Sequence, residues 1–213
     1  MKQHRINDAW NFIGGWYINP LVCDNLVQDF ENKKPARKTG APERGYDYLT
    51  TTSSNASVLT SYETEIYKVV DEYCRLYKFA KETISPFQME KPYNIQKYEP
   101  NMHYSVWHCE NNGNPPFNNR HLAFLTYLND LTHDGETEFL YQNVKIRPEK
   151  GLTLVWPAGF THIHRGCPSP TQEKYMVTGW FEYFNTNSFL STAVDAGDED
   201  FWNMLDKLDR NIT

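Results

Sequence analysis

The chain has 213 residues and a formal net charge of −6, a balance that gives no support to a general nucleic-acid-binding protein. No apolar stretch approaches the roughly 20 residues that span a bilayer, and the N-terminus lacks the apolar run of a secretory signal. The four cysteines have no CxxC spacing, so we expect a soluble cytoplasmic protein without a disulfide framework, and the length suits a single domain.

The first 91 residues predict helices that support a later β-rich region. Asn19-Pro20 marks a helix start, with Asn19 as the N-cap and Pro20 in the first turn, and this helix should end near Asn32. Thr60 and Glu63 have the spacing of a capping box and predict a second, amphipathic helix over about 61–81. Short strands are expected at 12–18, interrupted by two glycines, and at 46–49.

A basic segment joins these elements. Residues 33–45 carry five positive charges and one negative charge, with two prolines and two glycines. The simpler interpretation is a solvated connecting loop. The alternative is a mobile loop that contacts substrate, because binding residues often lie on loops held by a rigid scaffold.

From Pro92 onward, short β-like runs alternate with turn signals. Eight strands are expected, at 93–98, 104–109, 120–128, 136–141, 144–147, 152–156, 160–164 and 174–184. So many short strands in under a hundred residues indicate a double-stranded β-helix, the jelly-roll or cupin-like barrel. The predicted fold is therefore mainly β with flanking helices (α+β).

The chain ends in a polar, acidic region. Residues 198–210 can form an amphipathic helix, which predicts a helical C-terminal tail. With no internal repeat, we expect one domain over 1–213, composed of helical support (1–91), a jelly-roll core (92–184) and a tail (185–213).

His108-Cys109-Glu110 lies within the predicted barrel and suggests metal chemistry. On a strand, residues i and i+2 share one face, so His108 and Glu110 would present an imidazole and a carboxylate side by side. A histidine from another strand would complete the 2-His-1-carboxylate arrangement of non-haem Fe(II) oxygenases. His162 and His164, two apart on a predicted strand, could both face inward for this purpose. His4, His103, His121 and His133 have no such partner and are expected to be structural or exposed.

A His-x-acid match alone is weak, but the surrounding segments strengthen it. They are Tyr98-Glu99-Pro100, Trp107-His108-Cys109-Glu110, Arg120, Thr126-Tyr127-Leu128-Asn129-Asp130, Gly135-Glu136-Thr137-Glu138-Phe139, Pro148-Glu149-Lys150-Gly151, His164-Arg165-Gly166-Cys167-Pro168, Glu173-Lys174-Tyr175 and Trp180. In order and spacing they resemble the prolyl 4-hydroxylase branch of the 2-oxoglutarate-dependent Fe(II) dioxygenases, especially its short bacterial and viral members. The resemblance covers about 93–183.

The resemblance implies a role for each matching residue. It makes His108, Glu110 and His164 the iron ligands, and it selects His164 over His162 because the family places a basic residue ten positions after the second histidine. That residue is Lys174, which would bind the distal carboxylate of 2-oxoglutarate. Tyr98 and Tyr127 match tyrosines that line the co-substrate pocket, and Thr137 is a weaker candidate for the same task.

The implied activity is hydroxylation of peptidyl proline or a related residue, with release of succinate and CO2. Its cofactors are Fe(II), 2-oxoglutarate and O2, with ascorbate considered as a further reductant, and the expected partner is a peptide or protein. Glu110 departs from the aspartate usual in the family, which leaves the fine geometry of the metal site open. A neutral residue there would have indicated a halogenase instead.

Three alternatives stay open. The same cofactors could act on a free amino acid, a small molecule or a nucleobase, although Lys174 counts against the nucleic-acid demethylases, which use arginine in its place. The domain could also be a cupin-like metal-binding or sugar-binding module without redox activity. A zinc hydrolase is less favoured because the chain has no His-Glu-x-x-His motif. The sequence does not indicate the oligomeric state.

Overall fold

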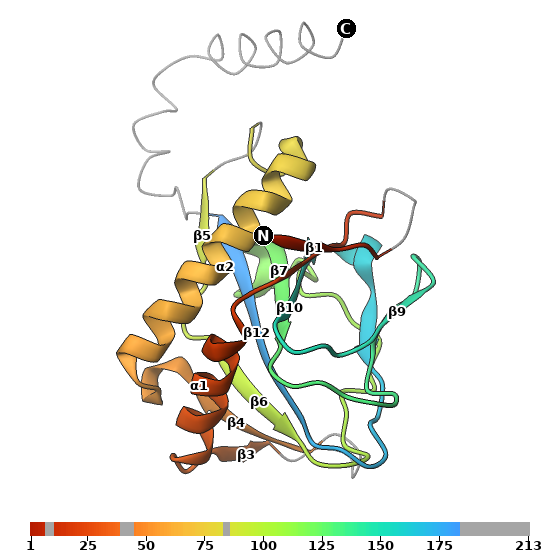
Figure 1. The fold of residues 1–213 in the computed structure, drawn as a ribbon. Helices are drawn as coiled ribbons and strands as arrows, with labels where there is room; N and C mark the ends of the chain where they lie inside the picture. Colours follow the sequence, from red (N-terminus) through yellow and green to blue (C-terminus); the bar gives the residue numbers. More distant parts are fainter. Residues whose placement is uncertain (7–10, 39–44, 83–85, 184–213) are drawn as a thin grey trace, which may run out of the picture.

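The computed structural model describes residues 1–6, 11–38, 45–82 and 86–183 (Figure 1). This part of the chain holds two α-helices and twelve β-strands. The helices are α1 (Pro20–Glu31) and α2 (Ala56–Leu76). The strands are β1 (Lys2–His4), β2 (Gly14–Tyr17), β3 (Ala36–Lys38), β4 (Tyr46–Thr50), β5 (Phe87–Met89), β6 (Asn94–Tyr98), β7 (Arg120–Tyr127), β8 (Thr137–Phe139), β9 (Val144–Ile146), β10 (Leu152–Pro157), β11 (His164–Gly166) and β12 (Lys174–Tyr183).

The strands form two antiparallel sheets. The larger has nine strands in the order β1-β2-β10-β7-β12-β6-β4-β3, with β5 also paired to β12. The smaller has the order β11-β8-β9. Strands β7 and β12 share the most extensive pairing and form the centre of the large sheet. The described part of the chain is thus mainly β with two helices, as predicted for these residues.

Two hydrophobic clusters lie on opposite faces of the large sheet. On one face, Leu26 and Tyr62 of the helices pack with Phe124 and other sheet residues. On the other face, Leu125 and Trp156 of the large sheet pack with Phe139 and Ile146 of the small one. Figure 1 shows α1 and α2 together on one side of the sheet and β9 on the other. The alternation along β7 places successive side chains in different clusters, as expected for a strand buried on both faces.

The first helix forms where the sequence predicts it. The Asn19 side chain accepts a hydrogen bond of 3.0 Å from the Leu21 backbone N–H, and Pro20 is the first helical residue. Cys23, Leu26 and Phe30 form its buried stripe. The helix ends at Glu31 with Asn32 as the C-cap, so the predicted end is also confirmed.

The boundaries predicted for the second helix are wrong at both ends. Helix α2 begins at Ala56, where Asn55 accepts a hydrogen bond of 3.0 Å from the Ser57 N–H, and it ends at Leu76. Asparagine caps a helix as well as threonine does, and the Thr60 hydroxyl instead donates 2.9 Å back to the Ala56 carbonyl within the helix. The residues after Tyr77 form a separate 3-10 turn, Lys78–Ala80.

Six of the eight predicted barrel strands are present, with ends that differ by a few residues. The strand expected at 104–109 is wrong, because its only β contact is an isolated bridge between His108 and His164. The strand expected at 160–164 is also wrong, because Phe160–His162 is a 3-10 helix and β11 starts at His164. The short strands β1, β3 and β5 were not predicted. Their pairing comes from distant partners that local patterns do not reveal.

The basic segment is partly a strand. Residues 36–38 form β3, which pairs with β4 in antiparallel orientation, so the interpretation of the whole segment as a connecting loop is wrong for these residues. Residues 39–44 and the predicted C-terminal helix at 198–210 lie outside the described residues. None of the described helices combines the length and the apolar character that a membrane span requires.

The close pairing of β7 and β12 requires a glycine at position 179. Gly179 is the cross-strand partner of Phe124, whose ring covers it: a Cβ built on Gly179 would lie 2.3 Å from Phe124 Cζ. We expect Gly179→Ala to lower the free energy of unfolding by about 1–3 kcal/mol, because the ring must move within a packed core. Denaturant unfolding measures this. Gly159→Ala is the matched control, since a Cβ there meets no atom within 4 Å, and an equal loss in both variants would contradict the packing argument.

Candidate metal and co-substrate site

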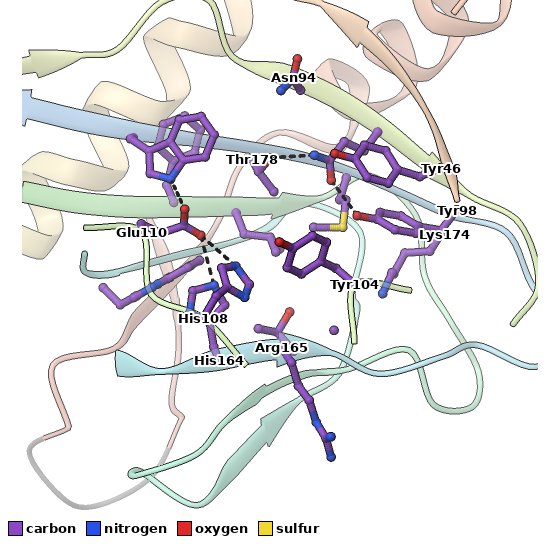
Figure 2. Close-up of a pocket in the computed structure, with 18 of the residues that line it drawn as sticks. Tyr46, Asn94, Tyr98, Tyr104, His108, Glu110, His164, Arg165, Lys174 and Thr178 are labelled. Atoms are coloured by element: carbon purple, nitrogen blue, oxygen red, sulfur yellow. Dashed lines mark hydrogen bonds and ion pairs between the residues drawn. The ribbon is translucent and has the colours of Figure 1, made fainter. Parts of the chain in front are cut away.

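A cavity of about 360 Å³ lies on the inner face of the large sheet. Alternate residues of two neighbouring strands line one wall: Asn94, Gln96 and Tyr98 of β6, and Lys174, Met176, Thr178 and Trp180 of β12. The opposite wall comes from β11 and from the irregular segment that follows β6 (Figure 2). Because side chains alternate along a strand, each strand contributes every second residue to the cavity.

The backbone places His108 and His164 opposite each other. The His108 N–H donates to the His164 carbonyl at 3.1 Å, and the His164 N–H donates to the His108 carbonyl at 2.9 Å. Two residues later, the Glu110 N–H donates to the Ala158 carbonyl at 3.0 Å. These bonds attach the irregular segment to β11 and to the end of β10. The segment therefore holds His108 and Glu110 on the same side without being a regular strand.

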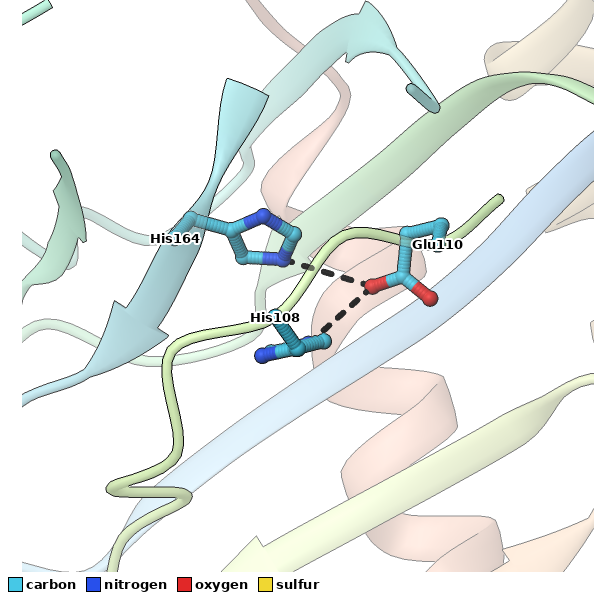
Figure 3. Close-up of side chains that lie close together, drawn as sticks. All are labelled: His108, Glu110 and His164. Atoms are coloured by element: carbon cyan, nitrogen blue, oxygen red, sulfur yellow. Dashed lines mark ion pairs between the residues drawn. The ribbon is translucent and has the colours of Figure 1, made fainter. Parts of the chain in front are cut away.

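The side chains of His108, Glu110 and His164 converge (Figure 3). Glu110 Oε1 lies 3.3 Å from Nε2 of His108 and 3.3 Å from Nε2 of His164. One potential ligand atom from each residue falls within 4.8 Å of the others, and no other such group of His, Cys, Asp or Glu occurs in the part of the chain that the structure describes.

The far nitrogen of each imidazole is bonded to the backbone. His108 Nδ1 lies 2.8 Å from the Val106 carbonyl oxygen, and His164 Nδ1 lies 2.9 Å from the His162 carbonyl oxygen. A carbonyl oxygen only accepts, so each Nδ1 carries a proton, and each ring in its neutral form presents the lone pair of Nε2 to the cluster. Metal-binding histidines have this outer support, and imidazole with carboxylate suits Fe(II). The donor set fits an iron ion.

Electrostatics favour an ionised carboxylate at this point. Burial alone would raise the pKa of Glu110, but its hydrogen bonds with His108 and His164 and their charge lower that pKa well below its usual range. Burial likewise opposes protonation of His108, yet the nearby Glu110 carboxylate raises the pKa of that imidazole. A divalent cation would replace the protons that the carboxylate now attracts.

The competing histidine is occupied elsewhere. His162 Nε2 lies 2.9 Å from the Asn11 carbonyl oxygen and Nδ1 lies 2.9 Å from the Thr161 hydroxyl, so neither nitrogen faces the cluster. His4 and His121 also hydrogen-bond to structural partners, and His133 is exposed. The structure therefore brings together the histidines that the resemblance selects.

Lys174 is buried at the end of the cavity distant from Glu110 (Figure 2). Its Nζ donates to the carbonyls of Gly135 at 3.1 Å and Cys167 at 3.4 Å, and within the described ranges it makes no ion pair with a carboxylate. Burial lowers the pKa of Lys174 to about 8. A buried ammonium without a counter-ion fits an anionic group of a ligand, which would supply the missing charge.

Two of the three remaining predicted residues line the cavity beside Lys174. Tyr98 is the cross-strand partner of Lys174, and Lys174 Nζ lies 5.3 Å from its ring centroid. Burial raises the pKa of Tyr98, so its hydroxyl stays neutral, and it donates to Gln96 Oε1 at 3.2 Å. Thr137 also lines the cavity, whereas Tyr127 lies behind it and donates to the Thr137 hydroxyl at 2.6 Å. Tyr127 thus supports Thr137 rather than lining the cavity.

Trp180 is a site residue whose contact sequence reasoning missed. Its Nε1–H donates to Glu110 Oε2 at 2.7 Å, and Arg120 stacks on its ring with the guanidinium carbon 3.5 Å from the ring centroid. The sequence indicates only its face, because Trp180 lies six residues after Lys174 on one strand and therefore points to the same side. Trp156 also lines the cavity, while Trp107 stacks on Arg165 and does not line it.

Sequence comparison places this region in a known superfamily. Residues 93–182 match the family model described as the 2OG-Fe(II) oxygenase superfamily, where 2OG is 2-oxoglutarate. A probable prolyl 4-hydroxylase 9 of Arabidopsis thaliana is 31% identical over 129 residues, 48% of this chain and 44% of the plant protein. A putative prolyl 4-hydroxylase of Acanthamoeba polyphaga mimivirus is 25% identical over 201 residues, 83% of this chain and 76% of its own length. The chain thus spans less than half the length of its plant relative.

Solved structures show the same fold. The viral collagen prolyl hydroxylase of Paramecium Bursaria Chlorella virus-1, in its 2OG complex, matches with a TM-score of 0.61 and 15% identity over 82% of this chain and 97% of that one. A Trichoplax adhaerens prolyl hydroxylase, in complex with a hypoxia inducible factor peptide fragment, matches with a TM-score of 0.63 and 13% identity over 84% and 87%. With the sequence match, these results identify residues 93–182 as a region of the 2OG-Fe(II) oxygenase superfamily and show that the chain is similar to prolyl 4-hydroxylases in sequence and fold.

Proposed function

We propose that this protein is a dioxygenase that depends on Fe(II) and 2-oxoglutarate and hydroxylates a peptidyl proline or a related residue, with release of succinate and CO2. The observation that carries the proposal is the convergence of His108, Glu110 and His164 in one cavity with the buried Lys174. A non-redox metal-binding module would have no need of a buried cation at the far end of that cavity.

His108, Glu110 and His164 would hold the iron through Nε2, Oε1 and Nε2. Bound iron, with 2-oxoglutarate and O2, supplies the oxidative decarboxylation and the hydroxylating power that no side chain provides. The chain's own contribution is to fix the ligand tautomers through Val106 and His162 and to keep Glu110 ionised.

Lys174 would bind the distal carboxylate of 2-oxoglutarate, with the neutral hydroxyls of Tyr98 and Thr137 as hydrogen-bond donors beside it. A cavity of about 360 Å³ lies at the lower end of the range of small-molecule sites and suits a five-carbon dicarboxylate with a substrate side chain next to it. Tyr127 would act through Thr137, whose hydroxyl it orients.

A peptide is the substrate class that we favour. The relatives carry prolyl hydroxylase names, and the matching structures are described with collagen and with a hypoxia inducible factor peptide. In this chain Lys38, the last residue of β3, lines the cavity together with Tyr46, the first residue of β4. Their position supports the interpretation of the basic segment as substrate-contacting, since an extended peptide that enters the cavity would pass the ends of these two strands.

The proposal also includes the core topology, the number of domains and the cellular environment. The two facing antiparallel sheets support a double-stranded β-helix core, and we retain a single domain over 1–213. All four cysteines are free thiols, which supports a reducing, cytoplasmic environment.

Mass spectrometry of reaction mixtures tests the activity and the substrate class together. The protein is supplied with Fe(II), 2-oxoglutarate, O2 and ascorbate, and with proline-containing peptides, the same peptides with alanine for proline, free amino acids or oligonucleotides. We expect succinate release together with the gain of one oxygen atom on a proline-containing peptide. Oxygen gain on a free amino acid or oligonucleotide alone would transfer the proposal to that substrate class, and no succinate from any substrate, in a protein that binds the metal, would contradict the enzymatic reading.

A further inference from the structure

The two oxygens of Glu110 have separate partners. Oε1 faces both histidines at 3.3 Å (Figure 3). Oε2 accepts the hydrogen bond of 2.7 Å from Trp180 Nε1. Glu110 has one methylene more than the aspartate usual at this position, and its carboxylate can rotate about an additional bond. Without a second contact, such a side chain could present both oxygens to a metal or swing away from it.

Trp180 is itself held in place by a charged stack. The Arg120 guanidinium carbon lies 3.5 Å from the Trp180 ring centroid and 4.5 Å from that of Phe117. Arg120 also makes two hydrogen bonds with the Glu90 carboxylate, at 2.7 and 2.9 Å, and the Glu90 N–H donates to the Trp180 carbonyl at 2.8 Å. The indole N–H is therefore fixed before any ligand binds.

The donor is specific to the indole. Arg120 Nη1 forms an ion pair with Glu110 Oε2 at 3.6 Å but lies beyond hydrogen-bond distance, so Trp180 is the hydrogen-bond donor to that oxygen among the described residues. A neutral donor leaves the full negative charge on the carboxylate while it fixes the orientation. Oε1 is then the oxygen that remains directed at the histidines.

We propose that Trp180 is a positioning residue that compensates for the extra methylene of Glu110 by holding Oε2, so that the glutamate binds the metal through Oε1 alone. This inference rests on the proposed metal site. One-oxygen binding keeps the remaining coordination positions free for 2-oxoglutarate and dioxygen, which the superfamily's three-ligand arrangement requires. The glutamate and the tryptophan act as a pair.

A double-mutant cycle with Co(II) as the probe tests the pairing. Trp180→Phe keeps an aromatic ring over Arg120 but removes the N–H donor, and we expect it to weaken Co(II) binding about 10-fold or more, the usual cost of losing an outer partner of a metal ligand. The Co(II) absorption spectrum should change with it, because the carboxylate gains a second coordination mode. In a Glu110→Asp background the shorter carboxylate is out of the indole's reach, so the same substitution should have a much smaller effect.

The outcomes separate the two levels of the proposal. If the unsubstituted protein did not bind Co(II), the proposal of the metal site itself would be overturned. Normal binding with an unchanged affinity and spectrum in Trp180→Phe, or an equal loss in both backgrounds, would overturn only the role of Trp180. Thermal unfolding of each variant is measured alongside.

A measurement on the unsubstituted protein avoids any folding defect. The indole N–H resonance of Trp180 should be shifted downfield by its carboxylate acceptor and should stay so when diamagnetic Zn²⁺ is added. Movement to the position of a free indole on Zn²⁺ addition would show that the metal takes both oxygens, and would contradict the inference.

Discussion

Replacing Glu110 with alanine is expected to weaken Fe(II) binding by at least about 100-fold. The substitution removes the only carboxylate of the cluster and leaves two neutral imidazoles, and even the loss of an outer partner of a metal ligand costs about 10- to 100-fold. Glu110→Gln should have nearly the same effect, because an amide has the size of the carboxylate but lacks its charge. An anaerobic Fe(II) titration followed by calorimetry measures both.

Glu99→Gln is the matched control for these variants. Glu99 lies outside the cavity, is about half exposed and pairs with Arg37 on the surface, so its neutralisation should leave Fe(II) affinity unchanged. If Glu110→Ala bound Fe(II) as tightly as the parent protein, the assignment of all three ligands would fail.

Lys174→Ala is expected to raise the concentration of 2-oxoglutarate needed for half-saturation by about 10- to 150-fold, while Fe(II) affinity changes little. The substitution removes one charge-assisted bond to the ligand carboxylate, which contributes about 1.5–3 kcal/mol. Lys174 lies at the opposite end of the cavity from Glu110, so the metal ligands keep their contacts. Equal losses of both affinities would indicate misfolding instead.

The pH dependence of 2-oxoglutarate binding gives an independent test of the same residue. Burial lowers the pKa of Lys174 to about 8, so its cationic form predominates below that pH and is lost above it. Only the cation attracts the carboxylate. The affinity for 2-oxoglutarate should therefore be nearly constant below about pH 8 and fall by up to about tenfold per pH unit above it.

Lys97→Ala serves as the control for both measurements. Lys97 lies next to Tyr98 but on the other face of β6, where it pairs with Glu31 and Glu173. Its loss should leave the affinity and its pH profile unchanged. A profile in Lys174→Ala with the same break near pH 8 would show that another group causes it.

The prediction of the fold was correct where the signals were local. Asn19 and Pro20 define the start of α1 by capping chemistry that needs only neighbouring residues, and the structure confirms it. The predicted start of α2 was wrong because Asn55 and Thr60 are both competent N-caps. The earlier start places Val58 and Leu59 within the helix, where they pack against the core. Strands β1, β3 and β5 were not predicted for a related reason. Each has only three residues and is stabilised by pairing with a strand that is distant in sequence or not recognisable from the local pattern.

The candidate site shows a similar division. The order and spacing of His108, Glu110, His164 and Lys174 led to residues that the structure brings into one cavity. The local reasoning about His108 was only partly right, because its segment is held by a bridge to His164 rather than by regular strand pairing. Tyr127 matched by spacing but lies behind the cavity, since the direction of a side chain depends on packing that spacing does not report.

The contact between Trp180 and Glu110 joins residues 70 positions apart and could not be read from either motif. The periodicity of strand β12 indicated the face on which Trp180 lies, but it did not indicate that the indole N–H donates to a carboxylate. Such a contact depends on how β12 and the segment around Glu110 lie relative to each other in the folded protein, which the local sequence does not indicate.

A crystal structure of the protein with Mn²⁺ and 2-oxoglutarate tests the central claim most directly. The account predicts a metal peak bounded by Nε2 of His108, Nε2 of His164 and Oε1 of Glu110, with a carboxylate of 2-oxoglutarate on Lys174 Nζ. A metal bound elsewhere, or a 2-oxoglutarate that leaves Lys174 bonded only to the Gly135 and Cys167 carbonyls, would contradict it.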